Sequence, residues 1–163
     1  MKILFLDIDG VLNNNAPISG VSQSPTLYRH KVALLNHVLM ETGALVVVSS
    51  AWRYLIHRGE MNLAGLDWLL RSHGMMAGRL AGVTRADPPG GDHGEWGNPN
   101  ERGQQIADWL REHPGDHTYA VLDDLDLGIT AAGHPFVQTD GKLGLGFSEV
   151  RQLMAILGER PNP

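Results

Sequence analysis

Short, continuous runs of apolar residues alternate along this chain with longer segments in which apolar residues recur every three or four positions. The continuous runs are typical of strands that are buried on both faces, and the spaced segments are typical of helices with one buried side. The runs predict strands over residues 3–6, 44–48, 79–83, 119–122 and 136–138.

The spaced segments predict four helices. The first covers residues 24–42, with Ser24 as its cap, Pro25 in its first turn and Gly43 at its end. The second covers roughly residues 62–73, the third opens with a capping box over residues 98–101 and stops near Pro114, and the last begins at Ser148. The apolar residues expected on the buried sides of these helices are Tyr28, Val32, Leu35, Leu39, Leu63, Leu66, Leu69, Leu70, Ile106, Trp109, Leu110, Val150, Leu153, Met154 and Leu157.

Strands that alternate with helices favour a mainly parallel sheet between layers of helices. We therefore expect an α/β fold, a Rossmann-like three-layer α/β/α sandwich, formed by residues 1–163 as a single domain. No internal repeat or linker divides the chain. The longest Gly- and Pro-rich stretch, residues 84–99, is expected to be a functional or mobile loop.

The amino-acid composition excludes several classes of functional site. An apolar fraction of 42% and a charged fraction of 19% describe an ordinary globular protein, and the absence of cysteine excludes disulfides, thiolate metal sites and cysteine nucleophiles. The net charge of −5 argues against a broad basic face for nucleic acid, although a local basic patch stays open. We expect neither a signal peptide nor a membrane-spanning segment, and hence a cytoplasmic protein without a membrane partner.

Three of the predicted strands end in polar side chains that suit one kind of chemistry. The pairs that follow these strands are Asp7 and Asp9, Ser49 and Ser50, and Asp123 and Asp124. A single Asp-x-Asp-Gly at a strand end is often only a turn. Three polar strand ends at the same edge of a parallel sheet instead indicate a site, because ligands bind beyond the carboxyl ends of the strands.

Clustered carboxylates repel one another, and a divalent cation such as Mg²⁺ relieves the repulsion. Such a cation can polarise a phosphoryl oxygen, and phosphoryl transfer also needs a hydroxyl donor and a cationic side chain. Ser49 can supply the hydroxyl. Arg102, in the opening turn of the third predicted helix, can supply the cation together with the positive end of that helix.

These features resemble the four motifs of the haloacid dehalogenase (HAD) superfamily of phosphohydrolases, in order and over nearly the whole chain. DIDGV is similar to the first motif and VVVSS to the second, Arg102 in NERGQQIADWL stands where the third usually has Lys, and VLDD is similar to the fourth. The resemblance implies that Asp7 is the nucleophile that forms an aspartyl phosphate, and that Asp9 is the general acid and base and a Mg²⁺ ligand through its carbonyl. It also implies that Asp7 and Asp124 bind Mg²⁺ directly, with Asp123 further from the ion.

On the substrate side, Ser49 is preferred over Ser50 as the hydroxyl donor because it directly follows the predicted strand, and Gly10, Ser50 and Arg53 are candidates for further contacts. Arg53 is equally well interpreted as a solvated surface residue. Trp52 and Trp96 could stack on a ring of the substrate, but packing in the interior is the better interpretation for both.

The function predicted from the resemblance is a Mg²⁺-dependent phosphomonoester phosphatase of the small type without a separate cap domain. A phosphotransferase of the same fold, or a regulatory domain that binds metal and phosphate without turnover, are the alternatives. The phosphorylated partner stays open among nucleotides, sugar phosphates, proteins and nucleic-acid ends. The segments around SSAWR and RGQQIADWL resemble members linked to nucleic-acid repair, and an open site without a cap would admit a phosphate on a large molecule.

Overall fold

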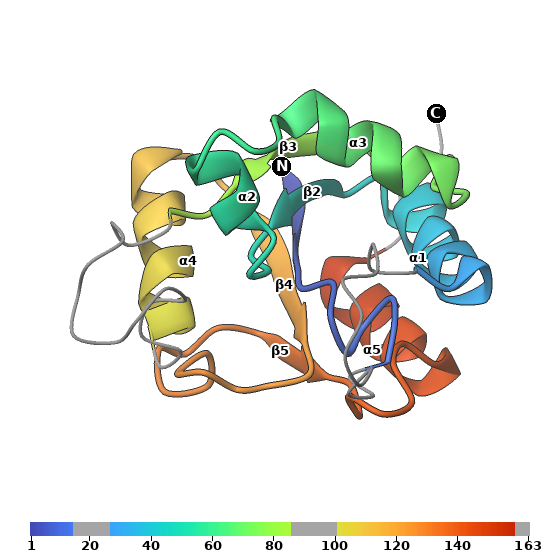
Figure 1. The fold of residues 1–163 in the computed structure, drawn as a ribbon. Coiled ribbons are helices and arrows are strands. Elements are labelled where there is room, and N and C mark those ends of the chain that lie inside the picture. The colour runs from blue at the N-terminus through green and yellow to red at the C-terminus, as the bar shows by residue number, and fades with distance from the viewer. Residues whose placement is uncertain (15–26, 86–100, 159–163) are drawn as a thin grey trace.

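The computed structural model describes residues 1–14, 27–85 and 101–158, and a sheet of five parallel strands forms its centre (Figure 1). The strand order is β3-β2-β1-β4-β5, so the N-terminal strand lies in the middle. The strands are β1 (Lys2–Leu6), β2 (Leu45–Val48), β3 (Leu80–Val83), β4 (Thr118–Asp123) and β5 (Phe136–Gln138). All five agree with the predicted runs to within a residue, which confirms the Rossmann-like α/β fold.

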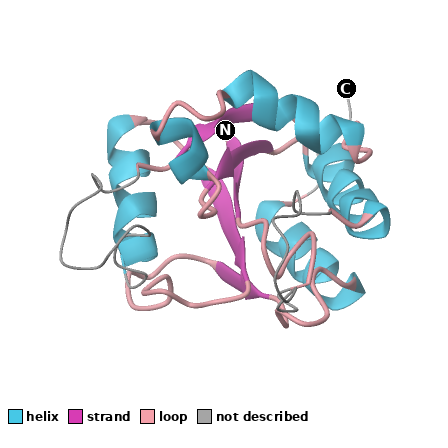
Figure 2. Ribbon diagram, viewed as in Figure 1, coloured by secondary structure: helices cyan, strands magenta, loops and turns pink. Residues whose placement is uncertain are grey.

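Helices cover both faces of this sheet (Figure 2). They are α1 (Arg29–Thr42), α2 (Arg53–His57), α3 (Leu63–Ser72), α4 (Arg102–Glu112) and α5 (Phe147–Leu157). The helices α1 and α5 lie side by side on one face, and α4 lies on the other (Figure 1). No helix within the described ranges is both long and apolar enough to cross a membrane.

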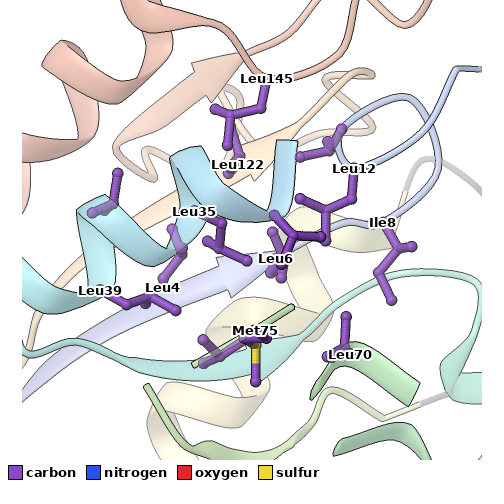
Figure 3. Close-up of a cluster of buried hydrophobic side chains, with 14 of the residues drawn as sticks. Leu4, Leu6, Ile8, Leu12, Leu35, Leu39, Leu70, Met75, Leu122 and Leu145 are labelled. Atoms are coloured by element: carbon purple, nitrogen blue, oxygen red, sulfur yellow. The ribbon is translucent and has the colours of Figure 1, made fainter. Parts of the chain in front are cut away.

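The alternation of side chains along β1 divides the interior into two clusters. Leu4 and Leu6 point into the larger cluster, which the helices α1, α3 and α5 complete (Figure 3). Ile3 and Phe5 point the other way, into a smaller cluster with Trp109 of α4. The central strand β1 is therefore buried on both faces, as its continuous apolar run predicts.

The helix boundaries differ from the sequence predictions at two places. The first helix begins at Arg29, after the half-buried Tyr28, and the predicted cap at Ser24 and Pro25 lies outside the described residues. At its end, Gly43 adopts a left-handed conformation with φ 71°, as expected of a helix-terminating glycine. The five-residue helix α2 was not predicted, because a single turn and a half is too short to show helical spacing.

The other helices follow the predictions closely. Asn62 caps α3 and accepts a hydrogen bond from the amide of Gly65 at 2.8 Å. The predicted capping box of α4 includes residues 98 and 99, which lie outside the described residues, and the helix itself begins at Arg102 after Glu101. Most of the expected apolar residues are buried, whereas Tyr28, Leu63, Leu69, Leu110 and Met154 are only partly buried.

The two connections that could carry a cap domain are described only in part. The first runs from β1 to α1 and contains residues 15–26, and the second runs from β2 to α4 and contains residues 86–100; both of these ranges lie outside the described residues. The other described residues of the second connection form α2, α3 and β3. The absence of a separate cap stays a prediction.

One helical glycine determines how closely α4 approaches the chain that follows β4. A Cβ atom on Gly103 would lie 2.7 Å from the carbonyl carbon of Gly128 and 3.0 Å from the Cβ of Ala132. The amide of Gly103 also donates to the carbonyl of Leu127 at 3.3 Å. A larger residue at position 103 would therefore push the start of α4 away from this segment.

We expect Gly103→Ala to lower the free energy of unfolding by about 1–3 kcal/mol, because overpacking against backbone atoms cannot be relieved by a side-chain rotation. Urea unfolding followed by circular dichroism measures the change. Gly65→Ala is the matched control, because Gly65 is also helical and its added Cβ meets only the flexible side chain of Met61 at 3.3 Å and Asn62 at 3.4 Å. The control should be neutral or stabilising, by roughly 0.5–1 kcal/mol. Equal stability of Gly103→Ala and the unmodified protein would contradict the close approach.

Candidate active site

A row of polar residues crosses the sheet where its strands end. Asp123 is the last residue of β4, and Asp7, Ser49 and Thr84 directly follow β1, β2 and β3. The amides of Asp7, Ser49 and Thr84 each donate to a carbonyl at the end of the neighbouring strand, at 2.9, 2.9 and 3.0 Å, so they continue the ladder by one residue. Because residues two apart share a face, this row lies on the side of the sheet that α4 covers.

Arg102, the first residue of α4, reaches the two acids of this row. Its Nη1 donates to Asp7 Oδ1 at 3.1 Å and to Asp123 Oδ2. All three side chains are buried, and Arg102 Nε has no hydrogen-bond partner among the described residues. The guanidinium therefore links the first, third and fourth sequence motifs.

Three acids form a cluster that a single arginine does not neutralise. Asp7, Asp123 and Asp124 each offer one carboxylate oxygen, and these three atoms lie within 4.8 Å of one another. Burial, reinforced by the charge of Asp123, raises the pKa of Asp7 to about 7 although Arg102 opposes the shift. Burial likewise raises the pKa of Asp124 to about 6, again with Asp123 adding to the effect.

The donor set of this cluster suits a hard cation. Mg²⁺ prefers oxygen ligands, and its charge favours the ionised forms of Asp7 and Asp124, whose pKa values are raised first by burial and then by the charge of Asp123. Asp123 is the least available of the three, because its Oδ2 accepts from Arg102 and its Oδ1 accepts from the amide of Leu125 at 3.0 Å. The structure therefore fits the predicted ligand set, with Asp7 and Asp124 the more accessible members.

The cluster opens into a small cavity of about 190 Å³. Its walls are formed by Asp7, Asp9, Ala51, Arg102, Asp123, Asp124, Leu125 and Leu127. Cavities for drug-sized ligands typically measure about 300–1,000 Å³, so this one suits a phosphoryl group with its ion rather than a whole substrate. A larger hollow of about 580 Å³ lies over residues 56–65 and contains none of these acids.

Asp9 lies on the cavity wall at the end of a tightly held loop. The positive φ of Gly10, 75°, makes the turn after Asp9, and the Gly10 amide donates to Asn13 Oδ1 at 2.9 Å. Ile8 and Leu12 on either side are fully buried (Figure 3), and burying each side chain stabilises the fold by roughly 1.5–3 kcal/mol. The predicted substrate contact Gly10 therefore gives its amide to the loop itself.

The two candidate hydroxyls differ in their surroundings. Ser49 Oγ is buried and has no hydrogen-bond partner among the described residues, whereas Ser50 Oγ accepts from the amide of Trp52 at 3.4 Å. A buried hydroxyl without a partner is costly unless a ligand satisfies it. Neither serine is among the residues that line the cavity, and the preference for Ser49 stays a prediction.

Arg53 lies in the interior and is not among the residues that line the cavity, so its interpretation as a surface residue is wrong. Its Nη1 donates to the carbonyls of Ser49 and Ser50 at 2.6 and 2.8 Å, and its Nη2 donates to Gln105 Oε1 at 2.8 Å. Arg53 thus fixes the end of β2 to the helix that carries Arg102. Its predicted contact with the substrate stays a prediction.

The packing interpretation of Trp52 is confirmed, because the side chain is 6% exposed and belongs to the larger core cluster. Trp96 lies outside the described residues. Sequence reasoning missed Asn13 and Thr84, and it missed the hydrogen bond that Trp52 makes with Asp9. Thr84 could have been found, because it too directly follows a predicted strand; the other two contacts depend on side-chain directions that no local pattern reports.

The raised pKa values predict how the stability of the metal-free protein depends on pH. Between about pH 4 and pH 7 the unfolded chain has released protons that Asp7 and Asp124 still bind in the folded state, so the free energy of unfolding falls as the pH rises. Asp7→Asn should flatten this fall, since the amide does not titrate. Urea unfolding in EDTA at about pH 5 and about pH 8 measures both slopes. The eight histidines also change the free energy of unfolding with pH, but they do so equally in both proteins, so the comparison removes their contribution. The same pH dependence in Asp7→Asn and in the unmodified protein would contradict the raised pKa of Asp7.

Comparison with known proteins agrees with this geometry. A family model described as the HAD domain in Swiss Army Knife RNA repair proteins matches residues 3–150, which contain all four motifs. A comparison with curated proteins gives no match. The buried acids, the arginine at the start of α4 and the parallel sheet are thus those of a recognised phosphohydrolase fold, and the chain belongs to the family of HAD domains in Swiss Army Knife RNA repair proteins.

Proposed function

We propose that this domain is a Mg²⁺-dependent phosphatase that removes a terminal phosphate from an RNA strand through an aspartyl phosphate. The observation that carries the proposal is the position of Asp7, at the floor of a small cavity between Arg102 and the remaining acids. The description of the family, which refers to RNA repair, supports the choice of RNA among phosphorylated molecules.

Each step of the proposed reaction uses a group at this cavity. A carboxylate oxygen of Asp7 forms a bond to phosphorus while the ester oxygen departs and takes a proton from Asp9. Asp9 then removes a proton from water, which attacks the aspartyl phosphate and releases inorganic phosphate and the Asp7 carboxylate. The Arg102 guanidinium, which lines the cavity, and the Ser49 hydroxyl, which is buried beyond its lining, are the proposed donors to the phosphoryl oxygens; Arg102 Nε and Ser49 Oγ have no partner among the described residues.

The metal would be held by Asp7 and Asp124, with Asp123 next to it and the carbonyl of Asp9 as a further oxygen ligand. Bound Mg²⁺ neutralises negative charge on the transferring phosphoryl group and on the acids around it. This role is supported by the charges of the cluster: it contains three carboxylates, and among the described residues the Arg102 guanidinium forms ion pairs with two of them, Asp7 and Asp123. Because Asp9 lines the cavity, hydrolysis accounts for the site better than a regulatory domain, in which a second acid would have no task.

The size of the cavity predicts which phosphate esters are good substrates. With Mg²⁺ present, kcat/KM should be more than about tenfold higher for a terminally phosphorylated oligoribonucleotide than for p-nitrophenyl phosphate or ribose 5-phosphate. Contacts outside the cavity need to contribute only about 1.4 kcal/mol for this ratio. Release of inorganic phosphate from 3′- and 5′-phosphorylated RNA, the matching DNA strands and the small esters measures it.

The control for this experiment is Asp7→Asn, whose amide is nearly isosteric but cannot attack phosphorus. It should abolish turnover of every ester in the panel while the protein stays folded by circular dichroism. Residual turnover above a few per cent would contradict the role of Asp7, and a small sugar phosphate as the best substrate would contradict the choice of RNA. Transfer of the phosphoryl group to an added alcohol instead of water would favour the phosphotransferase alternative.

Metal binding should depend more on Asp124 than on Asp123. We expect Asp124→Asn to weaken Mg²⁺ binding by more than about tenfold, as loss of a charged ligand does, and Asp123→Asn to weaken it less, because Asp123 already binds Arg102 and the Leu125 amide. Calorimetric titration with Mg²⁺ measures both affinities, with Asp126→Asn as the control because Asp126 is exposed and accepts from the amide of Thr130. The opposite order of the two losses would reverse the assignment.

A further inference from the structure

Both oxygens of the Asp9 carboxylate are held by side-chain donors that none of the family motifs includes. Asn13 Nδ2 donates to Oδ1 at 2.7 Å, and Trp52 Nε1 donates to Oδ2 at 2.9 Å. A free aspartate side chain would rotate about its terminal bond, because such torsions are broad. With one donor on each oxygen, the plane of the carboxylate is fixed.

Trp52 is held rigidly enough to act as such a donor. It directly precedes α2, only two residues after Ser50, and its own amide donates to Ser50 Oγ at 3.4 Å. The side chain is 6% exposed and packs in the larger core cluster, so the indole cannot turn away from Asp9 without opening the interior. An indole N–H only donates, and a carboxylate is its strongest partner when both are shielded from water.

Asn13 is fixed from the other side. Its Oδ1 accepts from the Gly10 amide at 2.9 Å while its Nδ2 reaches Asp9, so one amide group closes the turn and orients the acid. Thr139 Oγ1 donates to the Gly10 carbonyl at 2.8 Å and adds a further contact to this turn. The loop after β1 therefore holds one carboxylate oxygen of Asp9 through Asn13, and Trp52, in the turn between β2 and α2, holds the other.

We propose that Trp52 is a positioning residue for the reaction, which sets the orientation of Asp9 together with Asn13. The proposal rests on the proposed phosphatase function, in which Asp9 transfers protons. Proton transfer needs a heavy-atom distance of about 2.6–3.2 Å, so the rotation of Asp9 decides whether it reaches the ester oxygen. Each carboxylate oxygen has a second lone pair, so the two donors leave Asp9 able to exchange a proton at the cavity.

The test compares two esters of different leaving-group quality in Trp52→Phe, which keeps an aromatic ring but loses the N–H. With Mg²⁺, kcat/KM should fall about tenfold for ethyl phosphate and by no more than about twofold for p-nitrophenyl phosphate, whose leaving group needs little protonation. The expected loss is a fraction of the roughly 10²–10⁴-fold that general acid catalysis provides. Damage to the fold alone would lower both values equally, and that result would overturn the proposal.

The matched control is Trp109→Phe. Trp109 is buried to the same degree as Trp52, 5% against 6% exposed, but it packs on Phe5 in the smaller cluster. In this variant, kcat/KM should change by the same factor for ethyl phosphate and for p-nitrophenyl phosphate. A double-mutant cycle with Asp9→Asn then isolates the pair: once Asp9 is replaced, Trp52→Phe should cause no further selective loss for ethyl phosphate. Additive losses would mean that Trp52 acts independently of Asp9, contrary to the proposal.

A measurement without catalysis separates this inference from the proposed function. The chain contains four tryptophans, so a ¹H–¹⁵N spectrum resolves few indole N–H signals, and Trp52→Phe identifies the one from Trp52. Asp9→Asn should shift that signal and leave the Trp109 signal in place. An unmoved Trp52 signal would overturn the hydrogen bond itself. An unmodified protein that hydrolyses no ester would overturn the phosphatase and the positioning role with it, whereas an active enzyme whose Trp52→Phe variant behaves normally would overturn the positioning role alone.

Discussion

The repulsion among buried carboxylates is the constraint to which the rest of this structure responds. Asp7, Asp123 and Asp124 bring their oxygens within 4.8 Å of one another in a region where burial disfavours their charged forms. Among the described residues, Arg102 at the start of α4 forms ion pairs with two of them, Asp7 and Asp123. Gly103 lets the start of α4 lie close to the segment after β4, because any side chain there would meet the backbone at Gly128.

The sheet supplies the rigidity that such an arrangement needs. Parallel pairing extends the ladder one residue past the strands, so the backbone at Asp7 and Ser49 is fixed by hydrogen bonds rather than by a flexible loop. Arg53 then links the carbonyls at the end of β2 to Gln105 of α4. Movement of one motif would break contacts with another, so the motifs behave as one rigid unit at the edge of the sheet.

The sequence predicts the parts of this site that depend on strand ends and fails where long-range side-chain contacts decide. Asp7, Ser49 and Asp123 could be found because each sits at the point where an apolar run stops, and a parallel sheet places such points together. The bond from Trp52 to Asp9 joins residues 43 positions apart, and that from Arg53 to Gln105 joins residues 52 apart. Their formation depends on rotamers and on the direction of α2, a helix too short to show periodicity.

The small size of the cavity also means that the residues inside it differ from those that can contact the rest of a substrate. Its volume of about 190 Å³ is lined mainly by the acids and Arg102, so in the proposed reaction these residues can contact little beyond the phosphoryl group. The remainder of any substrate must lie against the rim, where Leu125 is 52% exposed and Leu127 also faces the opening. For the proposed phosphatase, we therefore expect selectivity among phosphate esters to depend on residues outside the four motifs. Because the motifs are tied together by buried contacts such as Arg53 with Gln105, changes at the rim can alter the substrate without disturbing the reaction.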